Sequence, residues 1–354
     1  MVPVPPRPAP TPGTAANAGP ELPVPTPTRT HPDPPPLRTA TGILTPVTTD
    51  LLPALADRAR AAAHARTPAC PCGAATLADR ADATVVRHAG TVAKAHAPDT
   101  DPTELALRVT AAAHLPDILV PPLGPTPVDL HGRLVTCWPY GTPVDPDDPD
   151  AAPWEAAAAL LARLHRTPAP VTLPPMRGPA KAARAIAALR ARAAQHPGAA
   201  PVLRAWAALP AWARGEAAMP DAATLCHGDL HLGQLVRHPA PEGPWLLIDV
   251  DDLGTGVPAW DLARPAAWYA CGLLPPDEWT RFLAAYRAAG GPAVPPDGDP
   301  WPALDVPARA LTAQTAARAV TKAVAADRPL DEVERSLVDA CARMASVALA
   351  FPRS

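Results

Sequence analysis

The apolar positions between residues 75 and 97 come in short runs that are typical of strands. His88-Ala89-Gly90 lies between two of these runs and has the composition of a tight turn. The expected strands are 75–78, 83–88, 91–97 and 134–137. This part of the chain therefore predicts a small, mostly antiparallel sheet.

Most of the remaining pattern is helical, with apolar residues three and four positions apart. The clearest helix start is at Asp101, which has the N-cap position, with Pro102 in the first turn and Glu104 at the capping-box position. The expected helices are 50–66, 101–114, 154–165, 179–195, 201–214, 260–271, 276–289, 306–326 and 330–349.

The change from strands to helices predicts the domain organisation. Residues 1–36 contain 14 prolines and few large apolar groups, so we expect a disordered tail. Residues 37–141 should form a small, strand-rich N-lobe, and 154–354 a larger helical C-lobe. The acidic, proline-rich stretch 142–153 would be the hinge or linker between them. The expected fold class is α+β, with two lobes and a cleft where ligands usually bind.

The composition narrows the function classes. The chain has 354 residues, of which 48% are hydrophobic and 18% charged, and its formal net charge is −3. Nucleic-acid binding and binding to anionic membranes therefore have no support from charge. No signal-peptide pattern and no apolar run of about 18 residues is present, so we expect a cytoplasmic protein without membrane spans.

The six cysteines are scattered, which predicts free thiols and no disulfide framework. Cys70 and Cys72 are the one close pair. Their spacing is not the two-residue gap of zinc knuckles, and no second pair matches it, so zinc binding is disfavoured there.

The densest set of ionisable groups inside apolar segments lies in residues 225–234 and 247–252. A buried carboxylate costs several kcal/mol unless it is paired or binds a metal, so this pattern indicates a site. If 235–238 and 245–250 pair around a six-residue loop, Trp245 lies opposite His238, and Leu247 opposite Val236.

The same register brings Asp249 opposite Gln234, on one face of the sheet, unless a bulge shifts it. Asp229 lies in the loop just before. An amide oxygen and two carboxylates are the hard oxygen ligands that hold Mg²⁺ and position a hydroxyl.

Lys94 stands out in the third strand, where Val92, Lys94 and His96 share one face. A lysine in such apolar surroundings is either on the exposed side of an edge strand or directed into a cleft. The residues alone leave both interpretations open.

The motif His227-Gly228-Asp229 with Gln234, followed by Ile248-Asp249-Val250-Asp251, resembles the catalytic loop and metal segment of the aminoglycoside phosphotransferase family. The form ending in glutamine is most similar to bacterial maltokinases and related sugar kinases. Trp260-Asp261-Leu262-Ala263 completes the pattern. The resemblance implies a two-lobed protein-kinase-like fold and an ATP- and Mg²⁺-dependent kinase for a small hydroxylated molecule, such as a sugar or an aminoglycoside-like compound.

The resemblance also implies roles in catalysis and metal binding. Asp229 corresponds to the catalytic base that orients the substrate hydroxyl, and Asp249 to the acid that holds Mg²⁺. Gln234 takes the place of the usual asparagine ligand. Lys94 corresponds to the lysine that contacts the α- and β-phosphates, and Glu104 is the candidate for the glutamate that pairs with it, although its capping position explains it equally well.

Further roles follow from the same resemblance. Trp138 to Tyr140 correspond to the hinge along which adenine bonds to backbone. Asp261 corresponds to an acid that braces the catalytic loop through backbone amides, and His227 to a structural residue that bonds backbone near the metal segment. His231 is either a substrate contact or a surface residue.

Asp251 and Asp252 could each bind substrate or a second metal, and Asp251 is favoured because it lies two positions from Asp249. Two alternative functions remain. The chain lacks a Gly-x-Gly-x-x-Gly phosphate loop, which together with Gln234 fits a catalytically weak pseudokinase that binds a nucleotide or metabolite. A metallohydrolase with His227, Asp229 and His231 as ligands is the other.

Overall fold

The computed structural model describes residues 51–64, 71–148 and 151–346. All of them belong to one of two units of the chain, Pro46–Ser354. The expected disordered tail, 1–36, lies outside the described residues. No described helix is long and apolar enough to cross a membrane.

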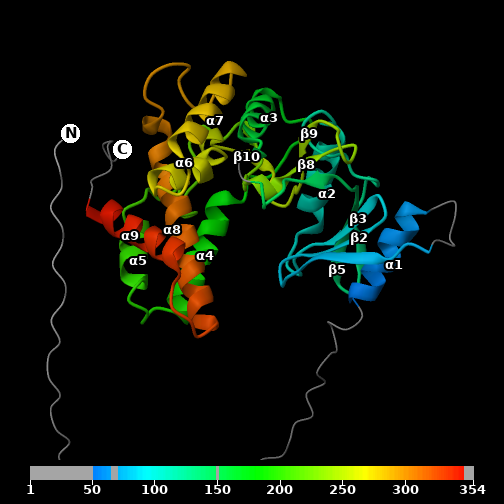
Figure 1. The fold of residues 1–354 in the computed structure, drawn as a ribbon, viewed down its shortest axis with the longest axis horizontal. Coiled ribbons are helices and arrows are strands. Elements are labelled where there is room, and N and C mark those ends of the chain that lie inside the picture. The colour runs from blue at the N-terminus through cyan, green and yellow to red at the C-terminus, as the bar shows by residue number, and fades with distance from the viewer. Residues whose placement is uncertain (1–50, 65–70, 149–150, 347–354) are drawn as a thin grey trace, which may run out of the picture. The chain divides into compact units, whose positions relative to one another are not determined.

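A five-stranded antiparallel sheet with the order β1-β2-β3-β5-β4 forms from the strand-rich part (Figure 1). Its strands are β1 (Ala74–Asp79), β2 (Thr84–His88), β3 (Thr91–Ala95), β4 (Val128–Leu130) and β5 (Arg133–Pro139). In β2 and β3 every second residue is buried, which is the period of a sheet with one covered face. The four expected strands are confirmed, and β4 was not expected.

Helix α1 (Leu51–Ala63) covers that face. Leu51, Leu55 and Ala59 recur every four residues, so they form one buried stripe on the helix. They pack in a small core against Val86, Ala93, Ala95 and Val135. This core holds β3, and therefore Lys94, in place.

Helix α2 (Pro102–Ala113) begins as expected. The side chain of Asp101 accepts a hydrogen bond from the Glu104 amide at 2.9 Å. Leu105 and Val109 of α2 belong to the larger core, which the C-terminal helices also form.

The second part of the chain is helical, as expected. Its helices are α3 (Trp154–Arg166), α4 (Gly178–Arg192), α5 (Ala199–Ala207), α6 (Ala263–Ala270), α7 (Pro276–Ala288), α8 (Trp301–Ala325) and α9 (Glu332–Ser346). α8 packs against α4, α5, α6 and α9 (Figure 1). Helix α5 is shorter than expected because Pro210 lacks the amide that a continuing helix needs.

Two small antiparallel sheets carry the polar segments. One pairs β7 (Thr224–Cys226) with β10 (Gly254–Gly256), and the other has the order β6-β8-β9. Their remaining strands are β6 (Thr142–Pro143), β8 (Leu235–Arg237) and β9 (Trp245–Leu247).

The predicted register of the β8–β9 hairpin is wrong by one residue. Leu235 lies opposite Leu247, and Arg237 opposite Trp245. The reason is that the His238 amide donates to the Pro244 carbonyl oxygen at 3.0 Å, so His238 lies opposite Pro244 and five residues, not six, close the loop.

Candidate active site

The loop after β7 carries Asp229 and is fixed by Asp261, a carboxylate that is 1% exposed. Asp261 accepts hydrogen bonds from the His227 amide at 2.6 Å and from the Gly228 amide at 2.7 Å. Gly228 has a φ of +87°, and a Cβ there would lie 2.4 Å from the Asp252 carbonyl oxygen. The loop thus depends on a glycine and on one buried acceptor.

A buried chain of hydrogen bonds supports this acceptor. His165 Nε2 donates to Asp261 Oδ2 at 3.0 Å, which leaves His165 Nδ1 to accept from the Tyr286 hydroxyl at 2.7 Å. The hydroxyl of Tyr286 in turn accepts from the Ala293 amide at 3.0 Å. Burial raises the pKa of Tyr286, so it stays neutral and keeps its proton as the donor to His165.

His227 connects the loop to the metal segment. Its Nε2 donates to the Ile248 carbonyl oxygen at 2.9 Å, the kind of backbone contact that the family resemblance implies. Its ring is therefore turned toward backbone. His227, Asp229 and His231 are not among the groups of described side chains that converge as metal ligands, so the metallohydrolase interpretation has no geometric support.

Gln234 and Asp249 do meet, with Gln234 Nε2 at 3.4 Å from Asp249 Oδ2. The register argument that predicted this was wrong, since the Gln234 carbonyl accepts from the Ile248 amide at 2.9 Å. Two departures from strand geometry bring the two side chains together despite the shifted register. Gln234 ends the 3-10 turn η2 (Leu232–Gln234), and Asp249 has a φ of +69°. A left-handed backbone costs an L-residue about 1 kcal/mol, which indicates that surrounding contacts hold Asp249 there.

Lys94 lies against this segment from β3. Its Nζ is 2.7 Å from Asp249 Oδ1 and 2.9 Å from Asp251 Oδ2. Burial alone would lower the pKa of Lys94, but the two carboxylates outweigh it and raise the pKa, so the lysine is charged. Lys94 therefore does not point into solvent from an edge strand. Its ammonium is directed at Asp249 and Asp251.

Asp251 is held in turn by His96. The His96 Nδ1 donates to Asp251 Oδ1 at 2.6 Å, and its Nε2 accepts from the Thr136 hydroxyl at 2.7 Å. Trp138 Nε1 donates to the same hydroxyl at 2.8 Å. Hydrogen bonds therefore connect the expected hinge residue Trp138 to Asp251.

The candidate pair between Glu104 and Lys94 is not formed. Glu104 Oε2 accepts from Arg108 at 3.0 Å, one turn along α2. Arg108 is 1% exposed, and its Nε donates to the Leu253 carbonyl at 2.9 Å. Because Asp249 and Asp251 already neutralise Lys94, a third carboxylate has no cation to meet there.

At the expected hinge, the backbone of Tyr140 already has protein partners. Its amide donates to the Gly90 carbonyl at 2.8 Å, and its carbonyl accepts from His238 Nδ1 at 3.3 Å. The Arg87 guanidinium lies 3.5 Å from the centroid of the Tyr140 ring. The Tyr140 amide therefore has a partner within the protein, whereas its carbonyl oxygen keeps a second lone pair for a further donor.

Asp229 has two partners that were not predicted, Lys181 of α4 and Arg264 of α6. Lys181 Nζ lies 2.6 Å from Asp229 Oδ2, and Arg264 donates to Asp229 Oδ1 at 2.6 Å. Burial would raise the pKa of Asp229, but Lys181 and Arg264 outweigh it and lower the pKa well below its usual range. Asp229 is therefore ionised.

Lys181 also lies 2.5 Å from Asp252 Oδ2, so it bridges two carboxylates. Asp252 is thus the acid beside Asp229, whereas Asp251, the one that the sequence favoured, faces Lys94. Lys181 lies 48 positions from Asp229, and no local pattern connects them. The composition did offer a clue to Lys181, because the chain has only three lysines, Lys94, Lys181 and Lys322.

His231 follows Asp229 in the loop and is partly buried. Burial, and then the charge of Arg264, lower the pKa of His231 to about 4. The ring is therefore neutral near pH 7.

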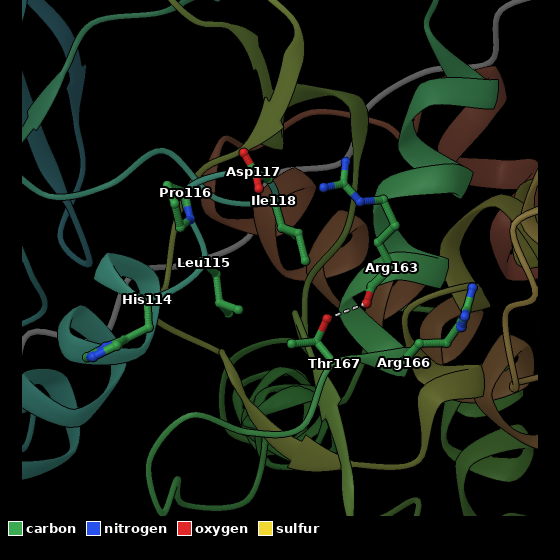
Figure 2. Close-up of a pocket in the computed structure, with 8 residues that line it drawn as sticks. All are labelled: His114, Leu115, Pro116, Asp117, Ile118, Arg163, Arg166 and Thr167. Atoms are coloured by element: carbon green, nitrogen blue, oxygen red, sulfur yellow. Dashed lines mark hydrogen bonds between the residues drawn. The ribbon is translucent and has the colours of Figure 1, made fainter.

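A cavity of about 400 Å³ lies away from these residues, beside the end of α2 and α3 (Figure 2). It is lined by His114, Leu115, Pro116, Asp117, Ile118, Arg163, Arg166 and Thr167. None of the candidate site residues lines it, so it is separate from the site above.

A second polar group lies at β2, where Cys72 Sγ is 3.2 Å from His64 Nε2 and 3.5 Å from His88 Nε2. Cys72 is disulfide-bonded, which contradicts the expectation of free thiols at this position. A disulfide sulfur is a poor metal ligand, so the group does not restore the zinc hypothesis. Among the other described cysteines, Cys137, Cys226, Cys271 and Cys341 are free, as expected.

The sequence model of the phosphotransferase enzyme family matches residues 75–304. The fold is similar to a putative aminoglycoside phosphotransferase from Ralstonia eutropha (TM-score 0.51, 14% identity), with 82% of this chain and 95% of that chain covered. It is also similar to aminoglycoside phosphotransferase APH(4)-Ia (TM-score 0.51, 12% identity; 77% and 93% covered). A choline/ethanolamine kinase family protein from Mesorhizobium loti gives a TM-score of 0.49 at 19% identity, with 84% and 96% covered.

No curated protein matches the chain. At these identities the solved structures inform the fold alone. The expected α+β, two-lobed protein-kinase-like fold is confirmed.

Proposed function

Because the chain belongs to the phosphotransferase enzyme family, we propose that it is a small-molecule kinase that transfers the γ-phosphate of ATP to a hydroxyl group. The observation that carries the proposal is the convergence of Lys94, Asp249 and Gln234 beside the braced loop of Asp229. A phosphoryl transfer needs charge neutralisation and an aligned hydroxyl more than covalent chemistry, and this set supplies both.

Lys94 is the cation for the phosphates. It lies on β3, is charged, and faces the segment of Asp249 and Asp251. When a nucleotide binds, the phosphate oxygens offer Lys94 new partners in place of these carboxylates. The positive charge then offsets the negative charge of the phosphates, which lowers the barrier to the approach of a nucleophile.

The donor set at Asp249 and Gln234 fits Mg²⁺. Both side chains carry hard oxygen atoms, they are in hydrogen-bond contact, and Asp249 is ionised because Lys94 holds its pKa below the usual range against the effects of burial and of Asp251. Asp249 and Gln234 would hold the ion. Bound Mg²⁺ supplies neutralisation of phosphate charge.

Asp229 acts on the acceptor. It is ionised and mostly buried, and the loop before it is fixed by Asp261. Its carboxylate accepts the hydrogen bond of the acceptor hydroxyl, turns the oxygen toward the γ-phosphate and receives the proton late in the transfer. The acceptor hydroxyl either bonds to a lone pair of Asp229 that Lys181 and Arg264 leave open or displaces one of these two cations.

Residues 37–141 and 154–354 are proposed as the N-lobe and the C-lobe, with 142–153 as the linker, so that Lys94 comes from one lobe and Asp229 from the other. The acceptor is a small hydroxylated compound such as a sugar or an aminoglycoside. We place the protein in the cytoplasm, where ATP is available, and propose no nucleic-acid or membrane partner.

A second candidate is a nucleotide-binding module without turnover. The observation that favours it is that both carboxylate oxygens of Asp229 already form ion pairs. The two candidates differ in whether ADP is released in the presence of an acceptor. Thermal stabilisation by ATP without ADP release on any acceptor would support the module.

The experiment is an ADP-release screen with ATP and Mg²⁺ over sugars, aminoglycosides, macrolides and amino alcohols. Acceptor-dependent ADP release at least tenfold above the acceptor-free rate is expected for one class. Failure of every acceptor, in a protein that folds and is stabilised by ATP, would reject the kinase proposal.

A further inference from the structure

The acceptor side of the site, by which we mean the surroundings of Asp229 and Asp252, contains positively charged side chains of the chain itself. Lys181 bridges Asp229 and Asp252, at 2.6 and 2.5 Å, and the Lys181 side chain is 19% exposed. Arg264 takes the other oxygen of Asp229, and Arg177 Nε lies 3.8 Å from Asp252 Oδ1. Among the described residues, three cations (Lys181, Arg264 and Arg177) therefore face two carboxylates (Asp229 and Asp252) in this cluster.

The nearby groups do not change this balance. Asp249 and Asp251 face Lys94, and Asp251 also faces His96. His231 is neutral near pH 7. In the part of the chain that the structure describes, each carboxylate of this cluster therefore has a cation, whereas an ammonium ligand needs an unpaired carboxylate.

Lysine is rare in this chain, and this makes its position informative. Of the 31 lysines and arginines, three are lysines, and two of these lie in the site. Lys322 of α8 is exposed. An ammonium on a flexible stem can bridge two carboxylates and then move aside, whereas the planar fork of arginine is held by fixed geometry. Lys181 thus combines a positive charge with a flexible stem that lets the ammonium shift between Asp229 and Asp252.

The position of the Lys181 ammonium therefore determines what binds. An acceptor hydroxyl either bonds to the second lone pair of Asp229 Oδ2 or takes the place of Lys181 Nζ there, and Asp252 Oδ2 holds the ammonium in both cases. The ammonium therefore stays beside the acceptor. It donates hydrogen bonds to neighbouring hydroxyls of a polyol, but it repels a second ammonium in a poorly hydrated site.

We propose that the acceptor is a hydroxylated compound without ammonium groups, the simplest being a neutral sugar, and that Lys181 is the residue that excludes cationic acceptors. The inference rests on the proposed kinase function and narrows it, because it separates neutral sugars from aminoglycosides and amino sugars. Lys181 acts here as a specificity-determining residue beside Asp229.

The test uses acceptors that differ only in one ammonium group, glucose with glucosamine and galactose with galactosamine, and adds maltose and an aminoglycoside. Initial rates of ADP release at pH 7 give kcat/KM for each. In the wild-type protein the neutral member of a pair is expected to be preferred by about tenfold or more. In Lys181→Met this preference should fall toward one.

Lys322→Met is the matched control and should leave the preference unchanged. Lys181→Arg, which keeps the charge, is the second variant and should keep the preference even if both rates fall. The preference is a ratio, so a general loss of folded protein does not move it. Preference of the wild-type protein for the amino sugars or the aminoglycoside, or an unchanged ratio in Lys181→Met, would overturn the inference while leaving the kinase function intact. Absence of turnover on all acceptors would instead reject the kinase function.

Discussion

Replacement of Asp261 by asparagine tests the brace under the loop that carries Asp229. Asp261 Oδ1 accepts from Gly228, and Oδ2 accepts from His227 and from His165. Asparagine keeps one acceptor oxygen and turns the other into a donor. In the better orientation the asparagine oxygen takes the Oδ2 position, and only the Gly228 amide loses its acceptor. In the worse orientation the oxygen takes the Oδ1 position, and both the His227 amide and His165 Nε2 lose theirs.

Each buried hydrogen bond to a charged group contributes about 1.5–3 kcal/mol. The free energy of unfolding of Asp261→Asn should therefore fall by about 1.5–6 kcal/mol, the lower half of this range for one lost bond and the upper half for two. Because the same bonds position the loop of Asp229, kcat should fall more than the affinity for ATP.

Urea denaturation followed by tryptophan fluorescence gives the first quantity, and ADP release the second. Asp57→Asn is the control, since Asp57 forms an exposed pair with Arg60 on α1 and should change stability by about 0.5 kcal/mol or less. A loss below about 1 kcal/mol in Asp261→Asn, with unchanged kcat, would refute the reasoning.

Two further predictions concern Glu104 and His231. Glu104→Gln should keep turnover within about threefold, because Glu104 pairs with Arg108 and not with Lys94; a loss like that of Lys94→Met in steady-state kinetics would contradict this. Burial lowers the pKa of His231 to about 4 from an ordinary value near 6.5, so the unfolded chain binds the extra proton first as pH falls. Stability is thus lost between pH 6.5 and 4, and His231→Gln should reduce that loss in urea titrations at pH 7 and 5.

The elements that local pattern determines were predictable. The stripe Leu51, Leu55 and Ala59 predicted α1, and the Asp101 cap predicted α2, because capping and periodicity involve residues within one or two turns. The short motifs at 225–234 and 247–252 pointed to Asp229 and Asp249 as candidate site residues through local sequence as well, and their roles stay predictions.

Contacts between distant segments were not predictable from such patterns. The β8–β9 register depended on how residues 238–244 close. Gln234 meets Asp249 because Gln234 ends a 3-10 turn and Asp249 adopts a left-handed backbone. The periodicity that favoured Asp251 over Asp252 assumed a strand, but β9 ends at Leu247. Lys181 approaches Asp229 through the packing of α4, which involves no shared local motif.

The proposal depends most on Asp229, and one variant tests it directly. Asp229→Asn should lose at least about 100-fold in acceptor-dependent ADP release, because the carboxylate no longer accepts the hydroxyl proton. Its affinity for ATP, measured by calorimetry, should stay close to that of the wild-type protein, since Lys94, Asp249 and Gln234 are unchanged. Retained turnover, or loss of ATP binding together with turnover in a folded variant, would contradict the account.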